Sequence, residues 1–337
     1  MRKLGVGVLG VGEMGKRHAE NLRRLVPEAR LIAVADVSEA RARQVAEEYE
    51  IERSYGSLDA MLEDKEIQAV VIATPDKFHA QAVVSAALAG KDVLCEKPLA
   101  LTLADARTAI DAVANASRRM QVGFMRRYDP AYAAAMQRIQ AGEIGTPVIF
   151  KSVGRDKDQP PIAAYEPMLN GMLFYTNTIH DFDLARWLMS DEVAAVHAFT
   201  TVAVRPEVAK YGDVVASVVN LRYHHGAIGN IESYAQAVYA YDVRTEIVGS
   251  KGSILVGSLD RVPALFLTAR GGEQLTAEHF LTRFADAYIA ELRDFVQTML
   301  SDRPPRVTGE DGLKALAIAV AAEKSHKQSN PVAVQLD

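Results

Sequence analysis

The stretch YTNTIHDFD, residues 175–183, gathers side chains that can carry or hold a proton. His180 lies three residues after Asn177 and close to two acids, Asp181 and Asp183. Because an imidazole titrates near neutral pH, it can accept a proton from a reacting group, bind a metal or remain hydrogen-bonded in a core. The residue types alone leave these three interpretations open.

The spacing of these side chains argues against a metal site. In a helix, Asp181 points to a different face from His180, and only Asp183, three residues further on, shares that face. No second His or Cys stands at ligand spacing. We therefore expect no bound metal, which leaves a proton acceptor or a core histidine.

A glycine-rich segment near the N-terminus, GVLGVGEMG, contains Gly10, Gly12 and Gly15 in the spacing G-x-G-x-x-G. It follows an apolar run and opens the helical pattern EMGKRHAENLRRL, which is the context of a dinucleotide-binding turn. Gly10 allows the tight turn, Gly12 lets a pyrophosphate approach the backbone, and Gly15 lets the helix pack closely. The helix N-terminus then faces the anion, with Glu13 and Met14 beside the cofactor.

Asp36 lies 21 residues beyond Gly15, at the end of the second apolar run. A carboxylate at this position accepts hydrogen bonds from the ribose hydroxyls and repels a 2′-phosphate. We therefore expect NAD as the cofactor in preference to NADP. Arg41 and Arg43 are near enough in sequence to weaken that preference, but they belong to the next helix.

Short apolar runs alternate with helical patterns up to about residue 125. The runs cover residues 4–10, 31–37, 69–74, 92–97 and 121–125. They are apolar almost throughout, as strands covered on both faces must be, and they predict βαβ units with a parallel sheet. The helix signals agree, because Thr102 and Thr308 each precede an Asp by three residues in a variant capping box.

The second part of the chain has a different pattern. Helical patterns at 130–142 and 178–189 precede strand-like segments at 193–204, 214–223, 227–235, 243–249 and 253–256. Consecutive strands without helices between them predict an antiparallel or mixed sheet, and so an α+β domain. We therefore expect an α/β protein with a dinucleotide-binding domain over 1–124 and an α+β domain over 125–337.

The composition is that of a globular protein, with 49% hydrophobic and 24% charged residues and a net charge of −5. No concentrated block of Lys and Arg indicates a nucleic-acid partner. No apolar stretch approaches the roughly eighteen residues of a membrane span. The single cysteine, Cys95, excludes an internal disulfide and fits a reducing compartment. A cytoplasmic protein that binds small molecules is expected.

Several motifs are distributed along nearly the whole chain. They are ATPDKFHA at 73–80, EKP at 96–98, GFMRRYDPAY at 123–132, GRDKDQPP at 154–161, TIHDFDLARWL at 178–188, YAYDVR at 239–244, GSKGSI at 249–254 and TGEDGLKALAIAVAAEKS at 308–325. With the glycine loop, these motifs resemble the family of glucose–fructose oxidoreductase, inositol dehydrogenase and rhizopine-catabolism oxidoreductases (Gfo/Idh/MocA). Within the family, the inositol 2-dehydrogenase branch is the nearest likeness.

The resemblance implies an N-terminal Rossmann domain and a C-terminal α+β domain on a large open, mostly antiparallel sheet. It also implies an active site in the cleft between the two domains. The implied substrate is a cyclic polyol or sugar oxidised at a secondary hydroxyl, with NAD as the cofactor. Family members form homo-oligomers, commonly dimers or tetramers, through the open sheet.

The resemblance assigns catalytic roles to Lys97 and His180. Lys97 would polarise the reacting hydroxyl from the end of a parallel strand, where open α/β sheets place their ligands. His180 would accept the hydroxyl proton. The family usually carries Asp four residues before this histidine, whereas this chain carries Thr176. Asp156 and Asp183 are the acids that could compensate for it.

Further contacts follow from the same resemblance. To the cofactor we assign Thr74, Pro75, His79, Glu96, Lys97 and Arg126, and to the substrate Lys97, Arg126, Asp156, Thr176, Asn177, His180 and Tyr239. His79 is expected to pack or cap rather than react, and Glu96 to position either the nicotinamide ribose or Lys97. Arg127 and Tyr241 are expected to be structural.

Three functional hypotheses follow. The leading one is an NAD-dependent dehydrogenase of a cyclic polyol or sugar. The second is an NADPH-linked reductase of an oxidised sugar, against which Asp36 argues. The third is a non-catalytic, dinucleotide-dependent sensor, which would not need to keep both Lys97 and His180.

Overall fold

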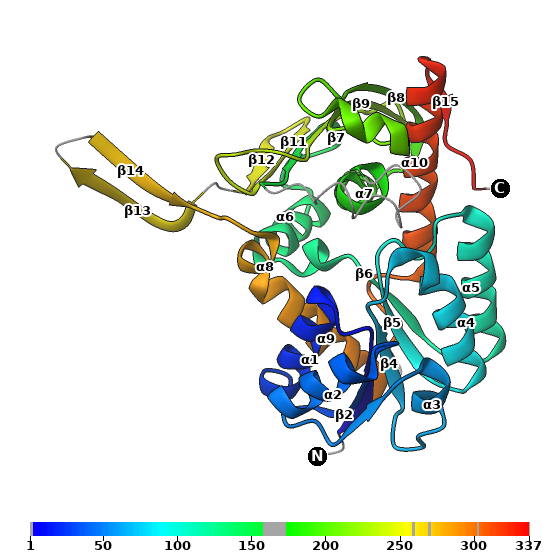
Figure 1. Ribbon diagram of the computed structural model, residues 1–337. Helices are drawn as coiled ribbons and strands as arrows, with labels where there is room; N and C mark the ends of the chain where they lie inside the picture. Colours follow the sequence, from blue (N-terminus) through cyan, green and yellow to red (C-terminus); the bar gives the residue numbers. More distant parts are fainter. Residues whose placement is uncertain (1–2, 158–172, 258–259, 269–270, 302, 337) are drawn as a thin grey trace. The chain divides into compact units, whose positions relative to one another are not determined.

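The computed structural model describes residues 3–157, 173–257, 260–268, 271–301 and 303–336. The chain forms two compact units, each built on its own large sheet (Figure 1). The first unit comprises Met1–Tyr128 and Asp286–Leu316, and the second comprises Asp129–Ala285 and Ala317–Leu336. No sequence pattern indicates that a late segment, residues 286–316, returns to pack with the N-terminal unit.

The first unit contains a six-stranded parallel sheet in the order β3-β2-β1-β4-β5-β6. Its strands are β1 (Leu4–Leu9), β2 (Ala29–Ala35), β3 (Arg53–Tyr55), β4 (Ala69–Ile72), β5 (Asp92–Glu96) and β6 (Met120–Gly123). This is the strand order of a Rossmann sheet, so the predicted fold of this unit is confirmed. Only the three-residue strand β3 was missed, because so short a segment shows no apolar run.

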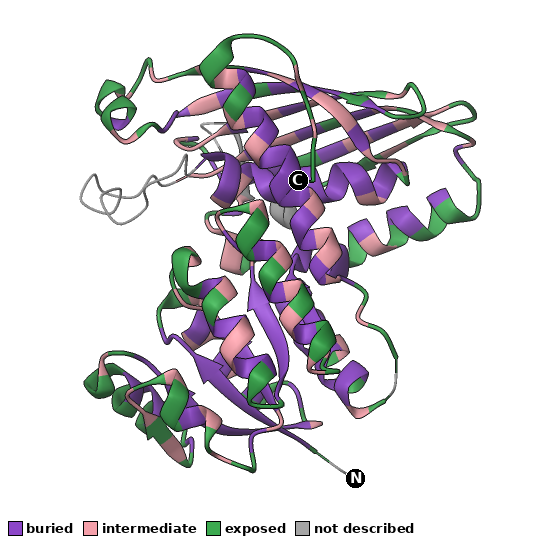
Figure 2. Cartoon of the chain, turned by 90° about the vertical axis from the view of Figure 1, so that its right-hand side faces the viewer, coloured by how far each residue is buried: buried purple, intermediate pink, exposed green. Residues whose placement is uncertain are grey.

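Helices cover both faces of the parallel sheet (Figure 1). On one face lie α1 (Glu13–Arg24), α2 (Glu39–Glu48) and α9 (Ala285–Leu300), and on the other lie α4 (His79–Leu88) and α5 (Leu103–Asn115). Shorter helices are α3 (Leu58–Leu62), η1 (Asp76–Phe78) and η2 (Met125–Tyr128). Side chains of α1, α2 and α9 join the strands in one apolar core. Figure 2 shows these strands buried, which explains their almost purely apolar sequences.

The two predicted capping boxes are present. The Thr102 hydroxyl accepts a hydrogen bond from the Asp105 amide at 3.1 Å at the start of α5. At the start of α10 (Gly309–Gln328), the Asp311 amide donates to the Thr308 hydroxyl at 3.2 Å, and the Asp311 carboxylate accepts from the Thr308 amide at 2.8 Å. Both caps satisfy N–H groups that a helix start leaves without partners.

The second unit contains a seven-stranded mixed sheet in the order β12-β11-β7-β10-β9-β8-β15. Its strands are β7 (Pro147–Arg155), β8 (Val193–Thr201), β9 (Ala216–Tyr223), β10 (Ile228–Tyr234), β11 (Asp242–Gly249), β12 (Ser253–Val256) and β15 (Val332–Ala333). Only the β7–β10 pair is parallel, so the predicted mostly antiparallel sheet is confirmed. A separate hairpin pairs β13 (Asp260–Thr268) with β14 (Gly271–Thr276).

One face of the mixed sheet is covered by helices. These include α6 (Pro130–Gln140) and α7 (Ile179–Met189), both predicted from the sequence. A π-helical turn, η4 (Leu173–Thr178), leads into α7, and η5 (Pro206–Tyr211) and α8 (Phe280–Arg283) are short. The Tyr132 hydroxyl of α6 lies 2.8 Å from that of Thr245 on β11. The amide of Ala198 on β8 donates to Ser325 of α10 at 3.0 Å.

The other face of the mixed sheet carries exposed side chains in the part of the chain that the structure describes. Along β9, buried and exposed residues alternate, with Val219 and Leu221 buried and Val218, Asn220 and Arg222 exposed. This period of two is the pattern of a sheet packed on one face only.

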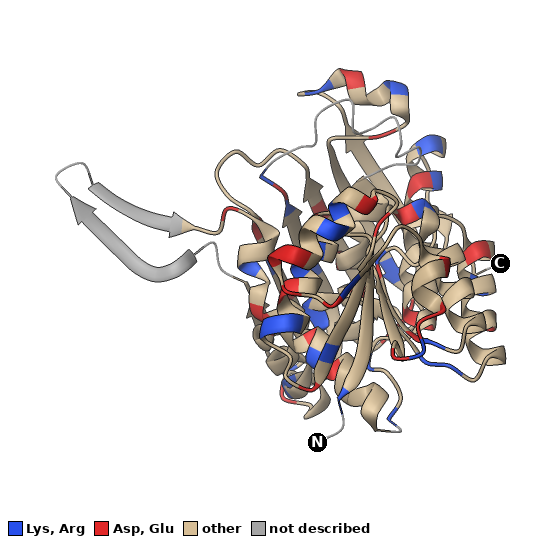
Figure 3. Ribbon diagram, turned by 60° about the horizontal axis from the view of Figure 1, so that its bottom comes forward, with Lys and Arg blue, Asp and Glu red and all other residues tan. Residues whose placement is uncertain are grey.

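The surface carries mixed charge. Figure 3 shows Lys and Arg interspersed with Asp and Glu over the described helices and loops. Many of these charges form local pairs, such as Arg53 with Asp64 at 2.6 Å. None of the described helices combines the length and the apolar character needed to cross a bilayer.

Candidate active site

The glycine loop between β1 and α1 has two positions that only glycine can occupy. Gly10 has a φ of +82°, and a Cβ there would lie 2.6 Å from the Ala73 carbonyl oxygen. A Cβ on Gly15 would lie 1.7 Å from the carbonyl oxygen of Gly10. The turn therefore folds tightly onto the start of α1 and against the segment that follows β4.

The N-terminus of α1 is open to a ligand. Its N-cap residue, Gly12, provides no side-chain cap. Apart from Gly12 and its chain neighbours, no described residue has an atom within 4 Å of the point where a Cβ would stand. Glu13 is exposed and Met14 half-buried in the first turn. Uncapped N–H groups at a helix N-terminus are a favourable site for a phosphate.

Asp36 is fixed against this loop. Its carboxylate accepts hydrogen bonds from the Val11 amide at 3.0 Å and from the Ser38 amide at 2.9 Å. Arg41 reaches the same carboxylate at 3.6 Å, although its side chain is 57% exposed. The acid is thus held at the ends of β1 and β2, where a ribose would lie beside a pyrophosphate bound at α1.

The segments after β4 and β5 are bridged by His79. Its Nδ1 lies 2.7 Å from the Pro98 carbonyl oxygen and its Nε2 lies 2.8 Å from that of Thr74. The ring is buried, in line with the expected packing role. The buried Thr74 hydroxyl has no hydrogen-bond partner among the described residues, and Pro75 beside it is exposed. The glycine cradle, the uncapped helix and this hydroxyl together fit a bound dinucleotide.

Lys97 follows β5 directly and is half-buried at the carboxyl end of the parallel sheet. Its peptide bond to Pro98 is cis. The preceding residue, Glu96, is buried, and its Oε1 lies 2.7 Å from the Nε2 of His18 on α1. Burial acts to raise the pKa of Glu96, but the hydrogen bond and charge of His18, with the charges of Lys97 and His79, lower it below its usual value.

The two arginines of η2 are both buried. Arg127 donates to the Asp311 carboxylate at 3.0 Å within the first unit, which agrees with its expected structural role. Arg126 is 3% exposed.

In the second unit, His180 lies in the first turn of α7 and is 8% exposed. The next residue, Asp181, points to the mixed sheet, where its Oδ1 accepts from the Ser152 hydroxyl at 2.6 Å. A Cβ on Gly154 would lie 2.7 Å from the other oxygen of Asp181, so glycine makes room for that carboxylate. No group of three His, Cys, Asp or Glu side chains in the described part of the chain is placed to hold a metal.

A chain of hydrogen bonds precedes His180. The Thr176 hydroxyl donates to Asn177 Oδ1 at 2.9 Å, and Asn177 Nδ2 donates to the carboxylate of Asp156. Asp156 stands just after β7. A carboxylate thus reaches the residue three positions before His180. Asp156 is one of the two acids expected from the sequence to compensate for Thr176.

The π-helical turn is anchored at both ends. The Leu173 amide donates to Asp213 at 3.2 Å, and the Tyr175 hydroxyl donates to Glu323 of α10 at 2.5 Å. Burial and the Glu323 carboxylate raise the pKa of Tyr175. The Thr178 hydroxyl donates to the Leu173 carbonyl at 3.0 Å and lies 2.9 Å from that of Ser233 on β10. Such turns are frequent at functional sites, and this one fixes Thr176 and Asn177.

Tyr239 is bound to neighbouring charges. Its hydroxyl accepts from Arg155 at 2.6 Å and donates to the fully buried Asp242 at 2.8 Å, while 46% of the residue is exposed. Arg155 also contacts Glu232 on β10. Tyr241 packs edge-on against Phe284, as expected of a structural residue. Residues 158–161 of the expected substrate loop lie outside the described residues.

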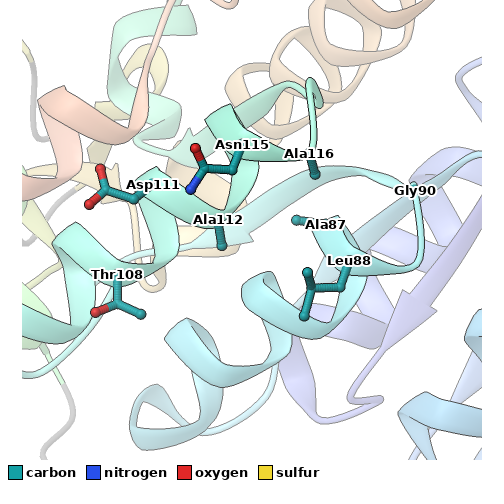
Figure 4. A pocket seen from close by; sticks show the side chains of 8 residues that line it. All are labelled: Ala87, Leu88, Gly90, Thr108, Asp111, Ala112, Asn115 and Ala116. Carbon is teal, nitrogen blue, oxygen red and sulfur yellow. The ribbon is translucent and has the colours of Figure 1, made fainter.

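A surface groove of about 650 Å³ lies between α4 and α5 (Figure 4). Its lining includes Leu88, Gly90 and Asn115, which precede the amino ends of β5 and β6. The glycine loop and Lys97 lie at the carboxyl ends of these parallel strands, so the groove is at the opposite edge of the sheet. It is therefore separate from the candidate cofactor site.

Two buried residues that interact with Glu96 were not singled out from the sequence, His18 and Glu291. The one available signal was the position of His18, three residues after Gly15 on the loop-facing helix. Glu291 offered none, because its helix α9 packs with the first unit from almost 200 residues further along the chain. No sequence pattern or motif reveals that α9 packs with the first unit.

Comparisons with known proteins agree with this geometry. A family model described as an oxidoreductase family with an NAD-binding Rossmann fold matches residues 4–124, and the model of its C-terminal alpha/beta domain matches residues 136–334. The chain is 38% identical to a scyllo-inositol 2-dehydrogenase (NAD(+)) of Bacillus subtilis, over 98% of this chain and 95% of the relative. It is 37% identical to a myo-inositol 2-dehydrogenase of Thermotoga maritima, over 98% of each. The crystal structure of a scyllo-inositol dehydrogenase from Lactobacillus casei with bound NAD(H) and scyllo-inositol superimposes with a TM-score of 0.93 at 28% identity, over 99% of each chain.

Proposed function

Because the chain belongs to the Gfo/Idh/MocA oxidoreductase family, we propose that it is an NAD-dependent dehydrogenase of an inositol-like cyclic polyol. The observation that carries the proposal is whole-length similarity to inositol 2-dehydrogenases in a chain that keeps Asp36, Lys97 and His180. We propose a cytoplasmic location as well, since NAD is available there and the free Cys95 would stay reduced.

NAD, when bound, supplies the acceptor for the hydride that leaves the substrate carbon. The chain would hold it through the N-terminus of α1, the Asp36 carboxylate and the Thr74 hydroxyl. The Lys97 ammonium would donate a hydrogen bond to the reacting hydroxyl oxygen and stabilise the negative charge that develops there. His180 would take the hydroxyl proton on its imidazole.

The replacement of the family's aspartate by Thr176 need not remove negative charge from this site. Asp156 binds Asn177, and Asn177 accepts from Thr176. In the proposed reaction, Asp156 would stabilise the imidazolium that His180 becomes, from the loop end of β7 instead of from the helix. The Asn177 amide would then be fixed in orientation for a substrate hydroxyl.

The proposal is tested by following reduced nicotinamide by its absorbance, with NAD and a panel that includes scyllo-inositol, myo-inositol and an aldose. We expect turnover with at least one inositol. Tight binding of NAD without turnover on any polyol would instead support the non-catalytic sensor. Activity confined to NADPH and an oxidised sugar would support the reductase.

The cofactor preference gives a sharper prediction. The ratio of NAD affinity to NADP affinity should be lower by about tenfold or more in Asp36→Asn than in the unaltered protein. The reason is that the variant loses the charge that repels a 2′-phosphate. Asparagine keeps one acceptor oxygen, which can serve the Val11 amide of the glycine loop, and gives up the bond from the Ser38 amide. Calorimetric titration with both cofactors measures the ratio, with Asp59→Asn on the exposed face of α3 as the control. Equal affinities in the unaltered protein would contradict the assignment.

We also propose that the open face of the mixed sheet joins copies of the chain into a dimer or tetramer. Phe199 on β8 is 57% exposed and pairs in register with Val218 on β9, which is 38% exposed. On β10, Ile228 is 54% exposed. Exposed apolar side chains gathered on one sheet face favour association.

Light scattering after gel filtration should therefore give a mass of two or four chains, and Phe199→Glu with Val218→Glu should reduce it. The new carboxylates would be buried without partners in the interface. Leu88→Glu, in the groove of Figure 4, is the matched control and should leave the mass unchanged. Should only the groove variant dissociate, the interface would lie on α4 and α5 instead.

A further inference from the structure

A cluster of polar side chains is buried between the parallel sheet and the helices α1 and α9. It comprises His18 of α1, Glu96 of β5, Gln121 of β6 and Glu291 of α9, and each is at most 7% exposed. His18 Nε2 lies 2.7 Å from Glu96 Oε1, and Gln121 donates to the Glu291 carbonyl at 3.4 Å. Burying several polar groups together costs free energy of folding, so a cluster of this kind indicates a function.

The cluster adjoins the candidate catalytic lysine through Glu96. Glu96 is the residue before Lys97, and β6 leaves room for its carboxylate at Gly123, where a Cβ would lie 2.9 Å from Oε2. His18 is held from the other side by the ring of Tyr288, edge-on at 6.1 Å. The pair therefore joins the helix of the glycine loop to the strand end that carries Lys97.

The charges around the pair favour an ionised Glu96. His18 provides the nearest donor, and Lys97 and His79 add positive charge from the segments after β5 and β4. On the opposite side, α9 contributes the acids Glu291 and Asp294. Burial and the negative charges of Glu96 and Asp294 raise the pKa of Glu291 well above its usual value, which disfavours a second negative charge in the cluster.

We propose that His18 is a positioning residue for the dehydrogenase reaction: its hydrogen bond to Glu96 fixes the Glu96–Lys97 segment relative to the glycine-loop helix. The inference rests on the proposed function for its effect on turnover. A shift of the segment would move the Lys97 ammonium away from the reacting oxygen. Small misplacements of catalytic groups lower the reaction rate strongly. The pyrophosphate would still bind the N-terminus of α1, so cofactor affinity should change little.

The test compares two replacements of His18. His18→Phe keeps a flat ring against Tyr288 but cannot donate to Glu96, whereas His18→Gln places an amide N–H near the position of Nε2. We expect kcat to fall by about tenfold to hundredfold in His18→Phe, with KM for NAD almost unchanged, and to recover in His18→Gln. Equal losses in both variants would overturn the proposal, since the ring shape and not the donor would then matter.

Hydrogen exchange of a peptide that spans residues 92–101 provides a readout independent of activity. Exchange should be faster in His18→Phe and close to that of the unaltered protein in His18→Gln. Arg24→Ala, on the exposed side of the same helix, is the matched control and should leave kcat and this exchange unchanged. Unchanged exchange in a folded His18→Phe would overturn the inference.

Two further results keep the test decisive. If His18→Phe does not fold, the double variant with Glu96→Gln removes the unpaired buried charge, and the exchange of 92–101 is read in that background against Glu96→Gln alone. If the unaltered protein reduces no NAD with any inositol, the proposed function fails. The exchange comparison then decides by itself whether His18 fixes the Lys97 segment.

Discussion

Replacing Lys97 with alanine is expected to lower kcat for polyol oxidation by about 100-fold or more, the usual effect of removing one electrostatic group from the reacting oxygen. The ammonium stands at the carboxyl end of β5, on the edge of the sheet where ligands of open α/β folds bind. The affinity for NAD should change by less than about tenfold, because the glycine loop and Asp36 hold the cofactor from β1 and β2. Steady-state kinetics and calorimetric titration of NAD measure the two effects separately.

Two comparisons show whether the loss belongs to this position. Lys65→Ala removes an exposed lysine near the amino end of β4 and should leave kcat unchanged. Lys97→Arg keeps the charge but replaces a compact ammonium with a planar group, so it should be intermediate between the unaltered protein and Lys97→Ala. Near-normal kcat in Lys97→Ala would mean that another group polarises the hydroxyl.

The parallel sheet was predictable because its physics is local. Strands buried on both faces must be apolar almost throughout, and five of the six strands carry that signature. The glycine spacing was informative for a similar reason, since Gly10 and Gly15 each occupy a place where any side chain would collide with backbone. Asp36 followed from its distance to that loop, and the structure adds its bond to the Val11 amide.

Two features of the fold had no local signal. Strand β7 alternates buried and half-exposed residues and contains Lys151, Ser152 and Gly154, so it lacks a strong apolar run. Its parallel pairing with β10 depends on a crossover that the sequence pattern does not record. Helix α9 is amphipathic in the ordinary way, and nothing in its composition says which sheet it covers.

The candidate site also has features with a local sequence signal and features without one. Motifs indicated Lys97 and His180 by residue type and position, but they could not say what holds each side chain. The bond between His18 and Glu96 joins residues 78 positions apart. The bond from Asn177 to Asp156 depends on a π-helical turn, and an α-helical count of residues does not predict that conformation.

Glu291 leads to the second large effect, on stability. Both its carboxylate oxygens are buried and lack a hydrogen-bond partner among the described residues. Burial, then the negative charges of Glu96 and Asp294, raise its pKa well above the usual value. The folded protein therefore keeps a proton on Glu291 at a pH where the unfolded chain releases it.

The sign of the pH dependence follows from that proton. A group whose pKa is raised on folding contributes its full stability below the unfolded pKa of about 4.3, and this contribution is lost as pH rises towards the folded value. Over that window the native state of the unaltered protein should lose about 1.4 kcal/mol per pH unit through this one residue. Glutamine has nearly the same shape and does not titrate, so the free energy of unfolding of Glu291→Gln should not fall with pH through this residue.

We therefore expect the free energy of unfolding of Glu291→Gln, minus that of the unaltered protein, to increase as pH rises above about 4.3. Urea titrations at several pH values give both curves, and their difference isolates the proton of Glu291 from the titration of all other groups. Glu47→Gln, on the exposed face of α2, is the control and should give a difference that is small at every pH. A difference for Glu291→Gln that stays constant with pH would mean that the carboxyl group ionises in the folded protein. In that case the buried cluster would carry two negative charges, one on Glu96 and one on Glu291.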